Sequence, residues 1–413
     1  MSLRLSSRVS VDNIRAMLNE MINQLTDYPF DRTRALLDVA QPPEGIEAIA
    51  LSIGEPQHAP PSLIAETVAA NAHLWGKYPR PDGIPELRQA VSSWLTRRFN
   101  VPNQDIDDKV GIIPVLGTRE ILYMAATLSV PRSVSGEQPV VLIPNPLYHV
   151  YSGGAIMAQA EPVLVPATHN SNFMPDYRNL DERTLRRTAM AYLCSPSNPQ
   201  GAIADINYLK DAIRLAREFD FVLAVDECYS EIYDQAPPPG ALQACAELGD
   251  GYKNVLVFHS LSKRSSAASL RSGFVAGDAE LIKNLRRLRC FSGATMPLPL
   301  QAASAALWND EAHVEEHRIK YRAKFDVAEK VLEGRYGYYR PGGGFFLWLD
   351  VGDGEEAAFK LWTEAGIRVQ PGAYMARSDD NGYNPGASYI RVALVHETDV
   401  IEKALKRLVK VLR

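Results

Sequence analysis

The sequence predicts a two-domain α/β protein in which a mostly parallel, doubly wound sheet forms the larger domain. Its 413 residues exceed what one ordinary hydrophobic core accommodates. The middle of the chain contains short apolar segments without clean polar alternation, which is typical of strands buried on both faces of a parallel sheet. Amphipathic helical patterns such as Tyr208–Phe219 lie between these segments, and this alternation indicates a doubly wound arrangement.

Several short strands are predicted in this middle part of the chain. Many are rich in Val and Ile, and five of them run directly into polar, turn-forming residues. Because ligands bind at the carboxyl ends of strands in open α/β sheets, these strand ends form the candidate site. The predicted strands are Val110–Val115, Val140–Ile143, Pro162–Val165, Ala189–Cys194, Phe221–Val225, Val255–His259 and Phe274–Ala276.

The last hundred residues predict a smaller α+β domain. A helical pattern without internal Gly or Pro extends from Pro299 to about Glu333. The strand-like Phe345–Val351 and Ile390–Leu394 follow, with a helix near Glu355–Ala365 between them and a final helix after them. A second, smaller domain of alternating helices and strands is therefore expected.

The change of pattern sets the expected domain boundaries. We expect residues 51–298 to form the large domain and residues 299–413 the small domain. Residues 1–50 are expected to be an N-terminal segment that packs on the small domain. The small domain would therefore combine the N- and C-terminal segments of the chain.

Composition and charge exclude several classes of partner. The chain is 46% hydrophobic and 23% charged, with a formal net charge of −5, so neither nucleic acid nor an anionic membrane surface is expected as a partner. No apolar run reaches the ~18 residues that span a bilayer, and the N-terminus lacks the apolar stretch of a signal peptide. We therefore expect a cytoplasmic protein. Its four cysteines show no C-x-x-C spacing, so no metal site is expected.

Three strand ends carry residues that could hold a flat, phosphorylated ligand. Gly117 and Thr118 precede a predicted helix, where free backbone N–H groups and a hydroxyl could bind phosphate; a plain Thr N-cap is the alternative. Tyr148 could stack on a ring or pack in the core. Asn198 lies in a Pro-rich turn and could donate to a phenolate oxygen or simply form the turn.

Two further strand ends supply a carboxylate and an amine. Asp226 ends an apolar strand, where a carboxylate is costly unless it is paired. A protonated pyridine nitrogen would pair it, as in sites for pyridoxal 5′-phosphate (PLP), and an N-cap is the alternative. Lys263 follows a buried strand and can form a Schiff base with an aldehyde cofactor, although one lysine taken alone is usually on the surface. Ser260 and Arg271 lie close enough in sequence to hold a phosphate.

The sequence resembles the class I/II aminotransferases, which are PLP enzymes of fold type I, from about Ile53 to Arg391. Ser260-Leu-Ser-Lys263 with Arg271 is similar to the lysine signature of the family. Further matching motifs are Ser195-Pro-Ser-Asn198-Pro-Gln-Gly201 and Val225-Asp-Glu-Cys-Tyr229. The resemblance implies a PLP-dependent enzyme that moves an amino group between an amino acid and a 2-oxo acid.

The resemblance implies a role for each residue around the cofactor ring. Lys263 would bind PLP as a Schiff base and later transfer protons. Asp226 would keep the pyridine nitrogen protonated. Asn198 and Tyr229 would bond the phenolate oxygen, and Tyr148 would stack on the ring. Lys263, Asp226 and Tyr229 form the expected catalytic set.

The resemblance also implies contacts to the phosphate and across a subunit interface. Tyr78 resembles the tyrosine that reaches the phosphate of the neighbouring subunit, so a homodimer is expected; core packing is the alternative for this side chain. The residues expected to hold the phosphate within the subunit are Thr118, Arg119, Ser260 and Arg271.

Arg391 is the expected partner of the substrate α-carboxylate, through a bidentate pair. Gly54 and Asn198 would lie beside the same carboxylate. A surface charge on a strand is the alternative for Arg391. Arg34 and Arg80 are candidates for binding a second, distal carboxylate, and both could be ordinary surface charges.

Within the family, the sequence is most similar to N-succinyldiaminopimelate aminotransferases, in motifs that include Leu51-Ser-Ile-Gly-Glu-Pro56 and Pro144-Asn-Pro-Leu-Tyr148. This implies N-succinyl-LL-2,6-diaminopimelate with 2-oxoglutarate or glutamate as substrates, in lysine biosynthesis. The loop Ser266-Ala-Ala-Ser269 departs from that pattern. Glycine is expected at position 269, and serine there loses easy access to positive φ.

Other functions on the same fold stay open. Fold and cofactor do not fix which bond breaks, so a PLP-dependent lyase is one alternative. An aminotransferase for aspartate or for a broad set of amino acids is another. A PLP-binding regulator is disfavoured because the first fifty residues show no helix-turn-helix pattern, and intact Lys263, Asp226 and Arg391 argue against a catalytically dead scaffold.

Overall fold

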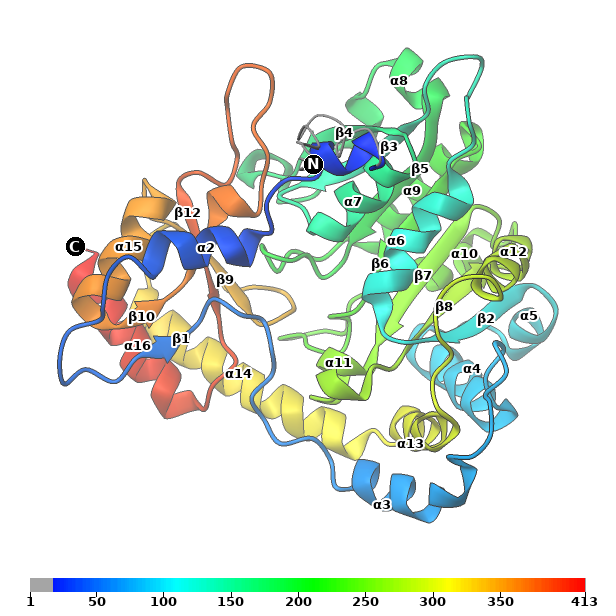
Figure 1. The fold of residues 1–413 in the computed structure, drawn as a ribbon, viewed down its shortest axis with the longest axis horizontal. Coiled ribbons are helices and arrows are strands. Elements are labelled where there is room, and N and C mark those ends of the chain that lie inside the picture. Colours follow the sequence, from blue (N-terminus) through cyan, green and yellow to red (C-terminus); the bar gives the residue numbers. More distant parts are fainter. Residues whose placement is uncertain (1–17, 413) are drawn as a thin grey trace, which may run out of the picture.

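The computed structural model describes residues 18–412, apart from the side chains of residues 107 and 108, and Figure 1 shows its arrangement. A seven-stranded sheet with the order β2-β8-β7-β6-β5-β3-β4 forms the centre of the larger domain. β8 runs antiparallel to both neighbours, and the other strands share one direction. The strands are β2 (Val110–Val115), β3 (Val140–Asn145), β4 (Glu161–Pro166), β5 (Thr188–Cys194), β6 (Val222–Asp226), β7 (Val255–Ser260) and β8 (Gly273–Asp278).

Helices cover both faces of this sheet, because successive side chains of a strand point to opposite faces. Leu142 of β3 packs in the core on one face, and its neighbour Val141 packs in the core on the other. The first face is covered by α4 (Pro85–Phe99), α9 (Ile206–Glu218) and α10 (Ala241–Leu248), and the second by α6 (Thr118–Ser129), α7 (His149–Met157) and α12 (Ala279–Arg289). The predicted doubly wound, mostly parallel sheet is confirmed.

The second domain packs helices on a small antiparallel sheet of order β11-β12-β9. A further strand pair joins β1 (Ile49–Ala50) to β10 (Ile367–Arg368) in parallel. The elements of this domain are β9 (Phe346–Asp350), β11 (Gln370–Pro371), β12 (Tyr389–Ala393), α14 (Ala312–Leu332), α15 (Gly354–Ala365) and α16 (Thr398–Val411). Leu349, Phe325 and Leu405 lie in its core with no more than 1% exposure.

The N-terminal segment contacts both domains. α2 (Pro29–Leu37) packs against α15, whereas the short turn Glu20–Gln24 lies against α7 of the large domain. Residues 1–17 of the predicted N-terminal segment lie outside the described residues. The remaining helices are α3 (Leu63–Ala70), α5 (Asn103–Asp108), α8 (Glu182–Arg187), α11 (Leu261–Arg264) and α13 (Leu298–Asn309).

The helix expected from Pro299 to about Glu333 is in fact two helices, and that expectation is wrong at Asp310. Asp310 is extended, with φ −99° and ψ 121°, between α13 and α14. α13 packs against α3 and α4, while α14 packs against α16, and Figure 1 shows α14 crossing toward the C-terminal helices. The chain changes partners at this point without Gly or Pro, so the sequence pattern does not reveal the break. We propose that the domain boundary lies here, one helix later than residue 298.

Between residues 18 and 412, no helix combines the length and apolar composition that crossing a membrane requires.

Candidate active site

A cavity of about 700 Å³ lies at the carboxyl ends of the parallel strands, where side chains of the small domain also reach it. A volume of this size is typical of sites for organic ligands. Tyr78, Arg34 and Arg80 do not line it, whereas eleven other site residues predicted from the sequence do. They are Gly54, Thr118, Arg119, Tyr148, Asn198, Asp226, Tyr229, Ser260, Lys263, Arg271 and Arg391.

Lys263 is held in the first turn after β7. The Ser260 hydroxyl caps α11 by accepting a hydrogen bond from Ser262 N at 3.1 Å, and Lys263 Nζ donates to the carbonyl oxygen of Gly54. Burial lowers the pKa of Lys263 to about 8, and the charges of Arg391 and Arg271 act in the same direction. An amine with this pKa is partly unprotonated near neutral pH, so it can act as a nucleophile and as a proton acceptor.

Asp226 ends β6 and is buried. Its Oδ2 accepts a hydrogen bond from Tyr151 OH at 2.7 Å, and its Oδ1 accepts one from Cys228 N at 3.3 Å. Burial raises the pKa of Asp226, and the bonds from Cys228 and Tyr151 oppose that rise. None of the ion pairs within residues 18–412 involves Asp226. A cationic group in the cavity would therefore supply the opposite charge that this buried carboxylate lacks.

Sequence reasoning assigned no role to Tyr151. Its spacing of three residues from Tyr148 is the signal that could have found it, because side chains at i and i+3 share one face of a helix. Both residues line the cavity at the start of α7. Their rings meet edge to face, with centroids 5.5 Å apart.

The N-terminus of α6 and the guanidinium of Arg271 form a cradle for an anion. Gly117 has φ 76° and ψ 175°, and a Cβ atom there would lie 2.5 Å from Arg271 Nη2. Arg271 donates to the carbonyl oxygens of Ala268 at 2.9 Å and Leu116 at 3.1 Å. Because a guanidinium carries five N–H donors and a helix N-terminus leaves backbone N–H groups free, the cradle suits a phosphate.

The loop before Arg271 does not use position 269 as expected. Ser269 lies in the 3-10 turn Ala268–Leu270. Positive φ occurs instead at Ser266, with 49°, and at Arg271, with 51°. The expectation that serine at 269 loses a required positive φ is therefore wrong, because the left-handed residues of this loop stand on either side of it.

Arg391 lies on β12 and is 3% exposed, which rules out the surface-charge alternative. Its Nη1 donates to Asn198 Oδ1 at 2.9 Å and its Nη2 to Ser52 O at 2.7 Å. Its Nε is buried and has no partner among the described residues. Burial lowers the pKa of Arg391 to about 10, so the side chain remains a cation at neutral pH and suits a carboxylate.

The remaining ring contacts come from both sides of the cavity. Asn198 Nδ2 lies 3.5 Å from Tyr229 OH, which places two polar groups side by side for a phenolate oxygen. Arg119 Nε donates to Tyr148 OH at 3.0 Å, which fixes the tyrosine beside the N-terminus of α6. These positions agree with the binding of a flat ring between β5, β6 and α7.

Three predicted residues lie away from the cavity. Tyr78 is 101% exposed in this chain, so the alternative of core packing is wrong. Arg34 is exposed and pairs with Asp31 at 3.1 Å. Arg80 is exposed and lies 4.0 Å from Asp82.

Known proteins resemble this chain over almost its whole length. Among solved structures, an aminotransferase from Neisseria meningitidis is 40% identical with a TM-score of 0.89, covering 96% of this chain and 100% of that one. Aminotransferase AspB from Helicobacter pylori is 36% identical with a TM-score of 0.84, covering 93% of this chain and 97% of that one.

Two curated relatives show the same extent of similarity. An LL-diaminopimelate aminotransferase of Moorella thermoacetica is 30% identical over 95% of this chain and 97% of its own length. The 4-dedimethylamino-4-oxo-anhydrotetracycline transaminase OxyQ of Streptomyces rimosus is 31% identical over 94% of this chain and 100% of its own length. A family model described as "Aminotransferase class I and II" matches residues 46–408. The fold, the cavity and this match agree, and the chain belongs to the class I and II aminotransferases, whose cofactor is pyridoxal 5′-phosphate.

Proposed function

We propose that this aminotransferase exchanges an amino group between N-succinyl-LL-2,6-diaminopimelate and 2-oxoglutarate, in lysine biosynthesis, with the cavity residues as its active site. The observation that carries the proposal is the buried cation Arg391, which lines the same cavity as Lys263 and whose Nε has no partner among the described residues. The diaminopimelate class is supported by relatives that are named LL-diaminopimelate aminotransferases. The motifs at residues 51–56 and 144–148 favour the succinylated form.

The chain's own residues would divide the chemistry among them. Bound PLP supplies a ring that takes up the electrons released at the substrate α-carbon. Arg391 binds the α-carboxylate and so holds the α-carbon near Lys263. Lys263 Nζ accepts the α-proton, for which its lowered pKa suits it. Asp226 balances the charge of the ring nitrogen, while Asn198 and Tyr229 bond the phenolate oxygen.

Arg119 is the best placed candidate for a distal carboxylate. The sequence-based candidates Arg34 and Arg80 do not line the cavity, whereas Arg119 does and is exposed there. One of its donors is used by Tyr148 OH, so the Nη groups are available for a second anion. Arg119→Ala should weaken the reaction with succinyl-diaminopimelate and glutamate more than the reaction with alanine.

A half-reaction screen tests the substrate. The PLP form is mixed with single amino acids, and loss of the visible band of the lysine-bound cofactor is followed. N-Succinyl-LL-diaminopimelate and glutamate should react fastest, ahead of LL-diaminopimelate, aspartate and aromatic amino acids. Faster reaction with unsuccinylated LL-diaminopimelate or with aspartate would replace the proposed substrate. Release of ammonia without formation of glutamate from 2-oxoglutarate would support the lyase alternative instead.

We also propose that the enzyme is a cytoplasmic homodimer in which Tyr78 reaches the neighbouring active site. Tyr78 is fully exposed in this chain, and the large apolar side chains Trp75 and Phe291 are 54% and 87% exposed. A second copy of the chain would cover such side chains, as expected of a subunit interface.

A further inference from the structure

Tyr151 is buried beneath the cavity, and packing against its ring holds the side chain in place. The side chain is 1% exposed. Its ring stacks on that of Tyr192, with centroids 4.4 Å apart and an interplanar angle of 12°. Tyr192 is itself anchored, because its hydroxyl donates to Leu122 O at 2.6 Å. The position of the Tyr151 hydroxyl is therefore set by ring packing between α7 and β5.

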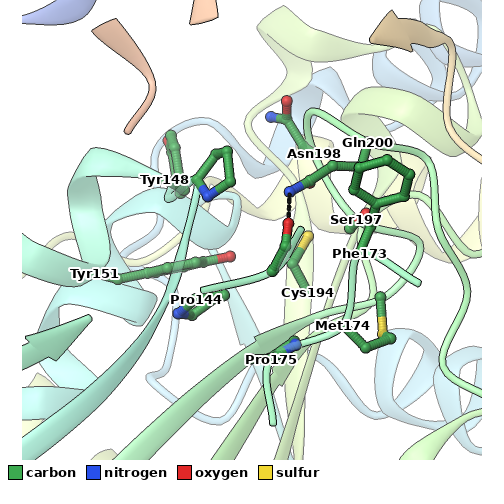
Figure 2. A pocket seen from close by; sticks show the side chains of 12 residues that line it. Pro144, Tyr148, Tyr151, Phe173, Met174, Pro175, Cys194, Ser197, Asn198 and Gln200 are labelled. Carbon is green, nitrogen blue, oxygen red and sulfur yellow. Dashed lines mark hydrogen bonds between the residues drawn. The ribbon is translucent and has the colours of Figure 1, made fainter. Parts of the chain in front are cut away.

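The hydroxyl of Tyr151 has one hydrogen-bond partner among the described residues, and that partner is Asp226 Oδ2 at 2.7 Å. Figure 2 shows Tyr151 reaching into a small pocket, with its hydroxyl directed toward Cys194. The other polar side chains around this pocket are engaged elsewhere. Gln200 Nε2 donates to Ala167 O at 3.2 Å, and Asn198 Oδ1 accepts from Arg391.

A buried carboxylate keeps its charge only when donors or cations compensate for lost hydration. The protein gives Asp226 two donors, the Tyr151 hydroxyl on Oδ2 and Cys228 N on Oδ1. Burial holds the pKa of Tyr151 well above that of a free tyrosine, so this hydroxyl stays a donor at any physiological pH. Each carboxylate oxygen of Asp226 thus accepts one hydrogen bond from the protein, and Asp226 also lines the cavity.

We propose that Tyr151 is a positioning residue that keeps Asp226 ionised and aimed at the ring nitrogen of PLP. This inference rests on the proposed role of Asp226. The proposed role depends on the Tyr151 hydroxyl and acts through Asp226 alone, whereas a packing role would depend on the Tyr151 ring.

The variant Tyr151→Phe removes the hydroxyl and retains the ring stacked on Tyr192. Loss of one hydrogen bond to a charged group should weaken PLP binding to the apoprotein about 10- to 100-fold. It should lower kcat by a similar factor with little change in KM for the amino donor. Binding is read by fluorescence titration of the apoprotein with PLP. The matched control is Tyr192→Phe, which removes a buried hydroxyl from the same stack and leaves both donors to Asp226 in place.

The protonation of the ring nitrogen gives a readout that packing would not change. With ¹⁵N-labelled PLP bound, the nitrogen signal should remain that of the protonated form across neutral pH in the wild type and in Tyr192→Phe. In Tyr151→Phe it should titrate at a lower pH. A titration identical to that of the wild type would overturn the inference. If Tyr151→Phe does not fold, 3-fluorotyrosine at position 151 serves instead, and an unchanged nitrogen titration contradicts the inference there too.

A double-mutant cycle separates this inference from the proposed site. If Tyr151 acts through Asp226, then Tyr151→Phe should have no further effect on PLP affinity in the Asp226→Ala background. Additive effects would assign Tyr151 a different role. If Asp226→Ala alone leaves PLP affinity and the nitrogen signal unchanged, the proposed role of Asp226 fails, whatever Tyr151 does.

Discussion

At the scale of single residues, burial decides what Lys263 can do. An exposed lysine is almost wholly protonated at neutral pH, and a protonated amine neither attacks an aldehyde nor accepts a proton. Burial in the cavity, together with the cations Arg391 and Arg271, lowers the pKa of Lys263 to about 8. The same cations suit a phosphate and a carboxylate, so we propose that one set of charges both binds these anions and lowers the pKa of the amine.

The rate of PLP incorporation into the apoenzyme should follow the titration of Lys263. Roughly a tenth of an amine with pKa 8 is unprotonated at pH 7, against a few in ten thousand for an ordinary lysine. The rate should therefore rise up to tenfold per pH unit below pH 8 and level off above it. Stopped-flow absorbance with a fixed PLP concentration measures this profile. A rate that keeps rising to pH 10 would show that the amine has an ordinary pKa.

Arg391 should govern affinity for α-carboxylates. Its Nε has no partner among the described residues, and its two Nη groups are already bonded to Asn198 and Ser52. Arg391→Ala should raise KM for the amino donor roughly a hundredfold, the value of a lost charged hydrogen-bond pair, and should change kcat less. Steady-state kinetics with Arg214→Ala, an exposed arginine on α9, provide the control. An unchanged KM would remove this role.

At the scale of elements, the turn between β2 and α6 forms the anion cradle. Gly117 has φ 76° and ψ 175°, a region that is essentially restricted to glycine. A side chain there would also meet Arg271 Nη2 at 2.5 Å. The conformation of the turn is therefore coupled to the position of the guanidinium that we propose binds the phosphate.

Gly117→Ala should impair PLP binding more than stability. The alanine side chain would strain the backbone of the cradle by about 1–3 kcal/mol. It would also force Arg271 away from the N-terminus of α6. We expect PLP affinity to fall at least tenfold. Gly249→Ala is the matched control, because Gly249 has φ 78° and a Cβ atom there would meet no other atom within 4 Å. That variant should lower the melting temperature of the apoprotein and leave PLP affinity unchanged. Equal PLP affinities for the two variants would contradict the assignment of the cradle.

The regular elements and the residues at strand ends could be predicted, because both leave a recognisable pattern in the local sequence. Apolar strands followed by Thr118, Asn198, Asp226 and Lys263 sit at one edge of a parallel sheet whatever the details of packing. The break at Asp310 could not be predicted, because it arises from the change of packing partners between domains. The bond from Tyr151 to Asp226 could not be predicted either, since it depends on the strand order β3-β5-β6, which local pattern does not reveal.

At the scale of the whole molecule, the cavity is built from both domains, and a third contribution is expected from a second chain. Gly54 and Arg391 come from segments joined to the small domain, and Lys263 and Asp226 come from the large domain. Movement of one domain against the other would therefore change the distance between the groups proposed to bind substrate and those proposed to bind cofactor. Tyr78 is fully exposed within one chain, so its predicted role requires a neighbour.

Hybrid dimers test that role. Tyr78→Ala should weaken PLP binding about tenfold through loss of one bond to the phosphate, and Lys263→Ala should be inactive. In a dimer that contains one chain of each, one site combines an intact Lys263 with an intact Tyr78 from the partner. Coexpression should therefore restore high PLP affinity to roughly a quarter of all sites if chains pair at random in two-fold dimers.

The control for the hybrid dimers is a mixture of the two variants, which are purified separately and mixed too briefly for chains to exchange between dimers. This mixture should show no restored sites. Sedimentation velocity should give twice the 45.7 kDa mass of the chain for each variant, since Tyr78→Ala removes one exposed side chain from a larger interface. If coexpression restores nothing while dimers form, Tyr78 acts within its own chain or not at all. If the protein sediments as a single chain at the concentrations that support activity, that result contradicts both the homodimer and the site shared between two chains.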